Sequence, residues 1–524
     1  MSTTSGPLPT PTDTSAQAED SGSPPAHAQT GATAFQAARA AARRHTTAAL
    51  AIVIGALALW AICGVGFVNY DTLYALVWGA QLTRGQTPEY GLPIAPTPHP
   101  LVELLGVPLA PLPAGVESAL VVALAFVALS ASGWVIYRLG SEWFGRAAGA
   151  LAALVWLTRV PVLSYGVRAY VDVPYTLLVL CALLVETRSR RAGGRAAVTV
   201  LALLALAGLL RPEAWVFSGL YWLYLAWSSR RSYPARSRRE LAWLALLAAA
   251  APLVWVASDL LVSGNPLWSL QNTKHTATTL GRPKGIADVP QYVPRRIGEV
   301  LQAVALAAAA IGAALSLWWL RRRALPGAIA GVAAIGAFAL LSSAGLPIDT
   351  RYAFLTAAIL CLFCGAAAFG WSALPAGDRR RAAWMGVGAV VLVALVASTP
   401  AQLRSAHREL AKLSRQQSIQ SDLLELVKSG AISLRCGPVG VPNHAPIPLL
   451  ALYLGARPGL IVSAEASPIA RGVYVDPASR EVETEYVLDA KDPHAQVSIP
   501  PGFGETATNR SWLIFKRCQE QLSK

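Results

Sequence analysis

The stretch EVLQAVALAAAAIGAALSLWWLRRRALPGAIAGVAAIGAFALLSS, residues 299–343, contains two long apolar runs separated by three consecutive arginines. Each run is about 20 residues long, enough for a helix to cross the roughly 30 Å hydrocarbon core of a bilayer. Inside lipid every backbone N–H and C=O must be paired within the protein, so each run is predicted to be a helix. Basic residues between spans favour the cytoplasmic side, which places Arg321 to Arg323 inside the cell.

The same pattern recurs along the chain and predicts an all-α polytopic membrane protein. Of its 524 residues, 54% are hydrophobic and only 14% are charged, whereas soluble proteins average about 25% charged residues. We predict eleven membrane-spanning helices. They cover residues 46–67, 115–137, 146–163, 173–187, 196–211, 214–228, 240–262, 299–319, 325–343, 352–372 and 384–399.

The charges of the connecting segments support this count. The net charge is +15, and the arginines gather in alternate loops, which the positive-inside rule assigns to the cytoplasm. Arg39, Arg43 and Arg44 precede the first span, so the N-terminus is predicted to be cytoplasmic. Because topology accounts for the basic residues, nucleic acid is not an expected partner. The lipid bilayer is the expected environment, in the cytoplasmic (inner) membrane.

Regions outside the spans define the predicted domains. Residues 1–45 contain a stretch rich in Ser, Thr, Pro and Ala, and we predict a disordered cytoplasmic tail. Residues 46–399 form the transmembrane domain, with long external loops at 68–113 and 263–298. Residues 400–524 have lower hydropathy and short strand-like runs, which predicts a small extracytoplasmic α/β domain.

The cysteines fall into two groups. Cys436 and Cys518 lie in the predicted external domain, where an oxidising compartment permits disulfides, so we predict that they pair. The other four lie within predicted spans. Cys361 and Cys364 form a C-x-x-C pattern on one membrane helix, which we interpret as core packing; a metal or redox role is the alternative.

A first candidate for catalysis follows the first span directly. Asp71 stands in the sequence Asn69-Tyr70-Asp71-Thr72, and an acidic residue at the end of a span is costly enough to suggest a function. The following residues, 73–82, are amphipathic and predict a helix along the membrane interface. The alternative is that Asp71 only caps this helix.

A second acid, Asp172, lies at the outer end of the fourth span, close to Arg168. Two carboxylates at the same depth on different helices can act as a general base and its partner. Alternatively, they can bind a divalent cation together. Arg168 can pair with either acid or with a phosphate. The alternative is a helix-capping aspartate beside a surface arginine.

His99 lies between two prolines, Pro98 and Pro100. Prolines on both sides make the segment stiff and non-helical up to the histidine. Such a segment suits a site that presents one imidazole, and it equally suits a simple turn. Metal ligation by His99 is a further alternative, although the spacing provides no second ligand.

The order of these motifs resembles that of bacterial GT-C glycosyltransferases related to protein O-mannosyltransferases and lipopolysaccharide-core sugar transferases. Asp71 matches the acid that opens the first external loop in that family. The family often has His-Pro-Pro, and adjacent acids, where this chain has His-Pro-Leu and Asp71-Thr72. The other matching residues are His99-Pro100-Leu101, Tyr137 to Gly140, Trp143 to Arg146, Tyr165 to Asp172, Gly208 to Glu213 and Arg351-Tyr352.

This resemblance implies a GT-C-like fold and a glycosyltransferase that transfers a hexosyl or pentosyl group. Such enzymes take the sugar from a polyprenyl-phosphate donor at the outer leaflet, generally with inversion, and pass it to an envelope glycan, lipid or protein acceptor. We assign Asp71 as the base that deprotonates the acceptor hydroxyl, and Asp172 as a residue that positions the acceptor or tunes the pocket. Because the leaving phosphate is an anion, cations should lie near it. The candidate substrate-binding residues are His99, Arg168, Arg211, Glu213, Lys274, Arg282, Arg295, Arg296 and Arg351.

Simpler interpretations of these basic residues, and other functions of the protein, are the alternatives. The basic loop 263–298 can simply touch anionic lipid headgroups, and Arg211 and Arg351 can snorkel toward the membrane surface. A transporter or flippase is the rival function; it predicts charged or broken segments near mid-membrane and often an internal repeat. Here the notable acids stand at span ends, which favours a reaction at the interface. A non-catalytic envelope scaffold is a third possibility.

Overall fold

The computed structural model describes residues 46–192, 196–230, 236–487 and 499–518. The predicted cytoplasmic tail, 1–45, lies outside the described residues. The chain divides into two units, Met1–Ala51 and Ile52–Lys524. The described part of the first unit, 46–51, is the beginning of the helix Thr46–Cys63.

All eleven predicted spans fall on helical segments, as their apolar runs require in lipid. These segments are Thr46–Cys63, α4 (Ala114–Phe144), α5 (Arg146–Leu157) with α6 (Val160–Val167), α7 (Asp172–Ala192), α8 (Ala197–Gly208), α9 (Glu213–Ser229), α10 (Arg238–Ser263), α12 (Val289–Trp319), α13 (Arg321–Ser343), η1 (Thr350–Ala353) with α14 (Phe354–Phe369), and α15 (Arg379–Lys428).

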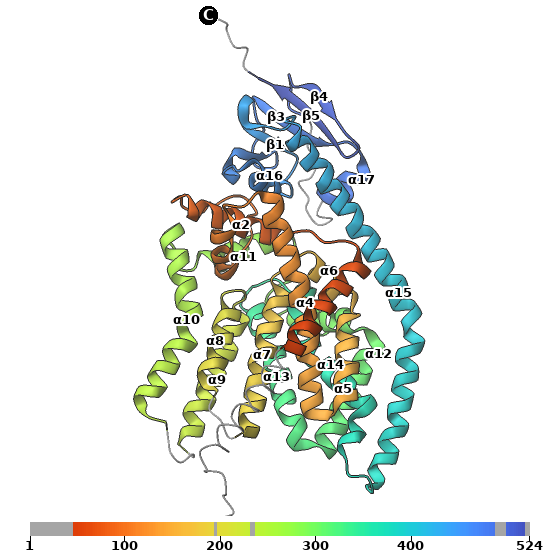
Figure 1. Ribbon diagram of the computed structural model, residues 1–524. Coiled ribbons are helices and arrows are strands. Elements are labelled where there is room, and N and C mark those ends of the chain that lie inside the picture. The colour runs from red at the N-terminus through yellow and green to blue at the C-terminus, as the bar shows by residue number, and fades with distance from the viewer. Residues whose placement is uncertain (1–45, 193–195, 231–235, 488–498, 519–524) are drawn as a thin grey trace, which may run out of the picture. The chain divides into compact units, whose positions relative to one another are not determined.

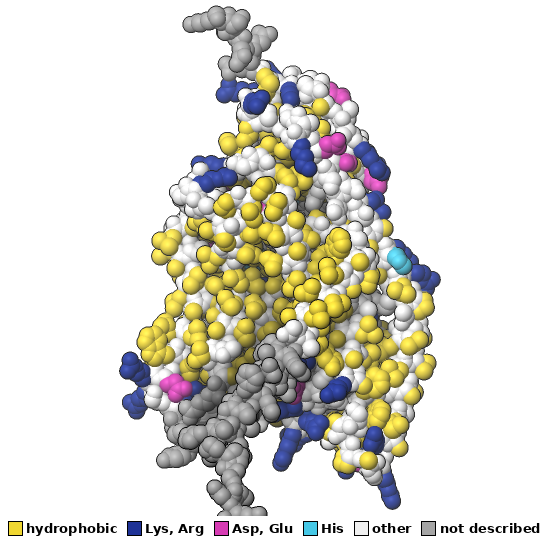
Figure 2. Space-filling view, viewed as in Figure 1, with side chains coloured by type: hydrophobic (Ala, Val, Ile, Leu, Met, Phe, Trp, Pro, Cys, Tyr) yellow, Lys and Arg dark blue, Asp and Glu magenta, His cyan; other side chains and the backbone are white. Residues whose placement is uncertain are grey.

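The helices are those of a multi-pass membrane protein. In the described part of the chain, seven helices are long and apolar enough to cross a membrane, or eight if α5 and α6, bent by 63°, form one span. On the face shown in Figure 2, hydrophobic side chains cover the helices and arginines and lysines gather toward their ends. The number of eleven crossings stays a prediction.

Small residues allow the central helices to approach closely. A Cβ on Gly312 of α12 would lie 1.9 Å from the carbonyl oxygen of Phe363 on α14, so the two backbones touch there. Close backbone approach at glycine is a common way for membrane helices to associate. Cys361 and Cys364 are fully buried free thiols in this core. Their surroundings therefore agree with the packing interpretation.

The first long loop folds into α2 (Tyr70–Thr83) and α3 (Pro100–Leu109). The expectation of an amphipathic interfacial helix is wrong, because every residue of α2 from Thr72 to Gln81 is buried. Gly79 lies against Gly106 of α3, where a Cβ would lie 2.8 Å from the Gly106 Cα. Helix α2 is therefore enclosed by protein and holds its first turn, with Asp71, in a fixed place. The second long loop forms α11 (Trp268–Thr279).

The C-terminal region begins inside a helix. α15 runs unbroken through residue 400, where the sequence predicted the domain to start. It leads into a five-stranded sheet of order β2-β1-β3-β5-β4, parallel among the first three strands and antiparallel among the last three. The elements are β1 (Val439–Val441), α16 (Ile447–Leu454), β2 (Ile461–Ser463), β3 (Gly472–Pro477), α17 (Arg480–Val482), β4 (Gly504–Thr508) and β5 (Trp512–Arg517).

Two kinds of link hold this region. A disulfide joins Cys436 to Cys518, the pair for which the sequence predicted one. The sheet and α2 share one hydrophobic cluster, in which Trp78 and Trp512 are both fully buried. Glu89, in the loop after α2, accepts a hydrogen bond of 2.8 Å from the backbone N–H of Gly459. The sheet region thus packs on the segment that begins with Asp71 (Figure 1).

Candidate active site

A polar cavity of about 140 Å³ lies where the first turn of α2 meets the ends of several helices. Its wall combines acids, arginines and aromatic rings contributed by distant parts of the chain. Because each side chain is attached to a helix end or a stiff loop, the arrangement is held by the fold. The polar residues of the lining include Tyr70, Asp71, Thr97, His99, Arg211, Glu213, Arg282, Arg351, Tyr352 and His444.

Asn69, and not Asp71, caps α2. The Asn69 side-chain oxygen accepts hydrogen bonds from the backbone N–H groups of Asp71, at 2.9 Å, and Thr72, at 3.2 Å. The Asn69 amide donates to the carbonyl of Ala169 at 3.0 Å, and so does the Thr72 hydroxyl at 2.9 Å. Ala169 has φ +54°, a costly conformation for a residue other than glycine. The local structure therefore leaves the Asp71 carboxylate free of the capping role.

Arg351 joins the two acids that the sequence singled out. Its Nη1 donates to Asp71 Oδ2 at 2.7 Å and lies 3.9 Å from Asp172 Oδ2. The Asp71 side chain is 17% exposed, whereas that of Asp172 is 1% exposed. The two aspartates therefore lie in one charged cluster, with Asp71 at the cavity and Asp172 behind it.

Arg211 holds the other side of Asp172. Its guanidinium forms ion pairs with Asp172 and with Glu213, and it lies 3.8 Å from the centre of the Tyr352 ring. Breaking a buried pair by removing one partner is strongly destabilising, typically by about 3–5 kcal/mol. The residues of this cluster are therefore expected to act as a unit.

Electrostatics keep Asp71 in its charged form. Burial by itself would raise the pKa of Asp71, but the nearby Arg351 guanidinium and its hydrogen bond outweigh burial and lower that pKa below its ordinary value. The carboxylate is therefore ionised at neutral pH. A group that must accept a proton needs this state.

His99 enters the same cavity as a neutral imidazole. Burial lowers the pKa of His99 to about 4, against the opposing attraction of Asp71. His99 immediately precedes α3, whose first residue is Pro100, so the proline fixes the backbone that presents the ring. Its Nδ1 is buried without a hydrogen-bond partner among the described residues. This nitrogen is available to a ligand.

Some of the predicted binding residues lie elsewhere. Arg168 stacks on Tyr165 and Tyr170, 4.7 and 5.1 Å from the ring centres, and its Nε donates to a backbone carbonyl. Arg295 and Arg296 both pair with Glu299, at 3.1 and 2.8 Å. Within the described chain, neither these three arginines nor Lys274 lines the polar cavity.

Of the basic loop, Arg282 does reach the cavity. Its Nη1 lies 3.5 Å from Asp349 Oδ2, and Arg351 Nε lies 3.9 Å from the same atom. Asp349 therefore connects the two arginines at the cavity wall. Asp349 was not among the residues predicted from sequence, although it stands two residues before the Arg351-Tyr352 motif.

His444, in the C-terminal region, was also not among the residues predicted from sequence. Its backbone N–H and its Nδ1 both lie 3.3 Å from Glu465 Oε2. Its ring meets that of Tyr70 edge-on, with 5.4 Å between ring centres. No motif links His444 to residues more than 370 positions earlier, so only the fold brings it to the Asp71 cavity.

The acids of the cavity are committed to arginines. Among the described residues there is no group of three or more His, Cys, Asp or Glu side chains placed to hold a metal ion. A cation bridging Asp71 and Asp172 would have to displace Arg351 from between them.

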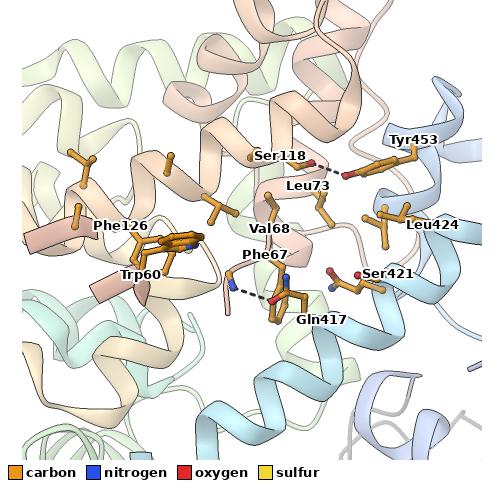
Figure 3. A pocket seen from close by; sticks show the side chains of 18 of the residues that line it. Trp60, Phe67, Val68, Leu73, Ser118, Phe126, Gln417, Ser421, Leu424 and Tyr453 are labelled. Carbon is orange, nitrogen blue, oxygen red and sulfur yellow. Dashed lines mark hydrogen bonds between the residues drawn. The ribbon is translucent and has the colours of Figure 1, made fainter. Parts of the chain in front are cut away.

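An apolar cavity of about 600 Å³ borders the same segment of chain on another side (Figure 3). Phe67, Val68 and Leu73 line it, whereas Tyr70 and Asp71 between them line the polar cavity. Polar contacts at its edges fix its walls: Gln417 accepts a hydrogen bond of 3.1 Å from the Gly66 N–H. The short segment 66–73 therefore contacts an apolar cavity and a charged one.

No protein-family model matches the sequence, and no curated protein matches it. Among solved structures, the described helices match the fold of a GT-C glycosyltransferase, and they do so over nearly the whole chain. That structure is ArnT from Cupriavidus metallidurans bound to undecaprenyl phosphate, with a TM-score of 0.51 and 16% identity over 89% of this chain and 97% of ArnT.

Two further structures complete the comparison. Apo ArnT from the same organism gives a TM-score of 0.51 and 14% identity over 90% of this chain and 98% of that one. The oligosaccharyltransferase AglB from Archaeoglobus fulgidus, in complex with an inhibitory peptide and a dolichol-phosphate, gives 0.45 and 12% over 80% of this chain and 64% of that one. At such low identity the likeness to ArnT concerns the fold, and the predicted GT-C-like fold is confirmed.

Proposed function

We propose that this chain is a membrane glycosyltransferase that moves a sugar from a polyprenyl-phosphate donor to an envelope acceptor at the outer face of the cytoplasmic membrane. One observation carries the proposal: the Asp71 carboxylate, hydrogen-bonded to Arg351, lines a small cavity that Arg211 and Arg282 also line. The GT-C fold supports it, since ArnT, which has this fold, has been solved with undecaprenyl phosphate bound. The charged cavity gathers residues from helix ends, as a reaction at the membrane interface requires.

Asp71 acts as the general base in this scheme. The acceptor hydroxyl oxygen bonds to the anomeric carbon while the bond from that carbon to the phosphate oxygen breaks. The hydroxyl proton passes to the Asp71 carboxylate, and the polyprenyl phosphate leaves with the electron pair. Attack and departure on opposite faces invert the anomeric centre.

Arg351 gives the base a means of activation. The same guanidinium that lowers the pKa of Asp71 is a strong ligand for phosphate. A donor phosphate entering the cavity therefore competes with Asp71 for Arg351. As Arg351 turns toward the phosphate, Asp71 loses its neutralising partner and becomes more basic when the donor is in place.

Asp172 is absent from the lining of the polar cavity, unlike Asp71. It is buried behind Arg211 and Arg351 and reaches the cavity only through them. We therefore assign it as a positioning residue for the two arginines. In this scheme those guanidinium groups, rather than a divalent cation, balance the charge of the acids and of the leaving phosphate.

The apolar cavity beside Phe67 suits the lipid tail of a substrate. A chain lying there and a head group beside Asp71 would both contact the segment 66–73. His444 lines the polar cavity from the C-terminal region and is a candidate contact for the acceptor. The rival, a transporter without transferase chemistry, has no need of an ionised base held by a dedicated arginine.

The test is Asp71→Asn, assayed in vesicles with a labelled polyprenyl-phosphate sugar and an envelope extract as acceptor. Loss of a general base should reduce transfer by about 10²–10⁴-fold. Glu505→Gln makes the matched change at an exposed strand residue and should transfer at the wild-type rate. Full activity of Asp71→Asn would reject the base assignment. Movement of a labelled lipid across the vesicle without a glycosyl product would instead support the transporter.

A further inference from the structure

A third cavity, of about 960 Å³, lies at the other end of the helices that build the candidate active site. α7 starts with Asp172 in the charged cluster and ends with Arg190 and Arg191 at this cavity. α9 starts with Glu213 at the active site and lines this cavity further along, with Phe217 and Tyr221. The cavity is therefore lined by the last turns of α7 and by residues of α9 beyond Glu213, and it has no part in the proposed transfer.

The wall of this cavity is mainly apolar and extends from buried residues to exposed ones. Leu180 and Leu204 are buried at the back, while Leu220 and Ile329 at the edge are 48% and 60% exposed. Cavities of roughly 300–1,000 Å³ hold ligands in proteins. A space of this size, open to a bilayer, suits hydrocarbon chains.

The rim of the cavity is charged, and part of that charge is already neutralised. Glu186 accepts hydrogen bonds from Arg190, at 2.5 Å, and from the hydroxyl of Tyr221, at 2.6 Å. Glu142 pairs with Arg191 and lies 3.5 Å from Arg188. The two acids of the lining are thus committed to arginines of α7 and to one tyrosine.

Two arginines of the rim remain. Arg322 and Arg323, in the first turn of α13, are exposed and have no acidic partner within the described part of the chain. The positive end of the helix dipole disfavours cations at that place and favours an anion. An anionic group above the apolar cavity would satisfy both the guanidinium groups and the helix end.

We propose that this cavity binds an anionic diacyl phospholipid of the surrounding bilayer. Its acyl chains lie among α7, α9 and α13, and its phosphate lies against Arg322 and Arg323. Basic pockets between membrane helices at one leaflet recognise anionic lipid head groups in this way. The two arginines should favour a lipid whose head group has a net negative charge over a zwitterionic lipid.

The polar half is tested on the purified full-length protein by native mass spectrometry with phosphatidylglycerol and phosphatidylcholine of identical acyl chains. The wild-type protein should retain phosphatidylglycerol in preference. Arg322→Gln together with Arg323→Gln should weaken that binding about tenfold. Arg238→Gln with Arg239→Gln removes the same charge at the exposed start of α10, outside the cavity, and should keep the preference.

The apolar half is tested by filling the cavity. Ala330→Phe with Ala333→Phe places two rings in the wall formed by α13 and should expel the lipid, while circular dichroism checks that the helices are intact. Equal retention of both lipids by the wild-type protein, or the same loss in the Arg238/Arg239 control, would overturn the proposal. Tighter binding of a polyprenyl phosphate than of phosphatidylglycerol would overturn it too, by assigning the cavity to the donor. None of these readouts depends on sugar transfer.

Discussion

The two ends of the helices use arginine in opposite ways. At the active-site end, Arg211 and Arg351 have side chains only 8% and 14% exposed, and each is paired with carboxylates. At the other end, Arg322 and Arg323 stand exposed on the first turn of α13 without an acidic partner among the described residues. Exposed arginines set topology and attract lipid at little cost, whereas buried charge pairs rarely stabilise a fold. Because buried charges add little net stability over apolar packing, a buried charged cluster is a candidate for function.

Removing Arg351 should have the largest effect of the substitutions that test this difference between buried and exposed arginines. Arg351→Met leaves Asp71 and Asp172 facing each other in a buried place, so transfer should fall by about 10³-fold. Unfolding should become easier by about 3–5 kcal/mol, because a buried pair has lost one partner. The measurements are transfer rate and thermal unfolding in the same detergent.

A matched change at the other end provides the control for Arg351. Arg379→Met removes an exposed arginine from the start of α15 and should change neither quantity. Arg351→Lys keeps the charge and should recover most of the stability while recovering little of the transfer, because lysine cannot share its charge between Asp71 and a phosphate as a planar guanidinium can. Equal recovery of both would mean that Arg351 serves only the fold.

Asp172 should show the smaller loss expected of a positioning residue. Asp172→Asn frees Arg211 and Arg351 to move, and transfer should fall by about 10²-fold through misplacement of the phosphate ligands. The loss should appear in kcat more than in the KM for the acceptor, and Asp172→Glu should restore part of it. If the acceptor KM rises instead with kcat unchanged, Asp172 contacts the acceptor as the sequence first suggested.

Several features of this cluster were predictable from sequence, and several were not. Apolar runs and basic loops identify the spans, because a segment in lipid must pair its backbone groups within a helix and because Lys and Arg favour cytoplasmic loops. Asp71 and Arg351 were both candidates, but no periodicity connects residues 280 positions apart. The alternative that Asp71 caps α2 is wrong, because Asn69 is the cap. Asn and Asp are both good cap residues, so only the backbone geometry chooses between them.

The C-terminal region was the least predictable part. Its strands are three to six residues long, too short for a strong alternation, and α15 continues through Pro400 without a break at the predicted domain boundary. The arrival of His444 at the Asp71 cavity depends on the sheet packing against α2, which is a tertiary contact with no local signature. The disulfide could be predicted from sequence, because the predicted external domain contains two cysteines, which can pair in one way.

The pH dependence of stability sharpens the comparison at His99. Burial lowers the pKa of His99 to about 4, below the value of about 6.5 expected in the unfolded chain. Between these two values the unfolded chain binds more protons, so stability should fall as pH decreases from about 6.5 to about 4, by about 3 kcal/mol. Thermal unfolding across this range measures the slope.

His99→Gln should flatten that slope, because the variant has no imidazole to protonate. His407→Gln, at an exposed position of α15, should leave the slope of the wild-type protein unchanged. An unaltered slope in His99→Gln would place the titrating group elsewhere. Asp71 has the same sign, because its pKa in the folded protein is also lowered. Its contribution to stability is present above the ordinary carboxyl range and is lost as pH falls through the folded value, below the window used here.

The smallest expected effects concern Arg282 and Arg295, which were both predicted from sequence to bind substrate. Arg282 lines the polar cavity beside Asp349, whereas Arg295 is 62% exposed and pairs with Glu299 on its own helix. Arg282→Gln should raise the KM for the donor by about tenfold, since it removes one cation from the phosphate's surroundings. Arg295→Gln should change kcat and KM by less than about twofold, because exposed ion pairs contribute at most about 1 kcal/mol. Titration of the labelled donor against both variants distinguishes them, and an equal effect would mean that the whole basic loop attracts the anionic donor over distance. That long-range attraction would weaken sharply with added salt, whereas a direct contact from Arg282 inside the cavity would persist.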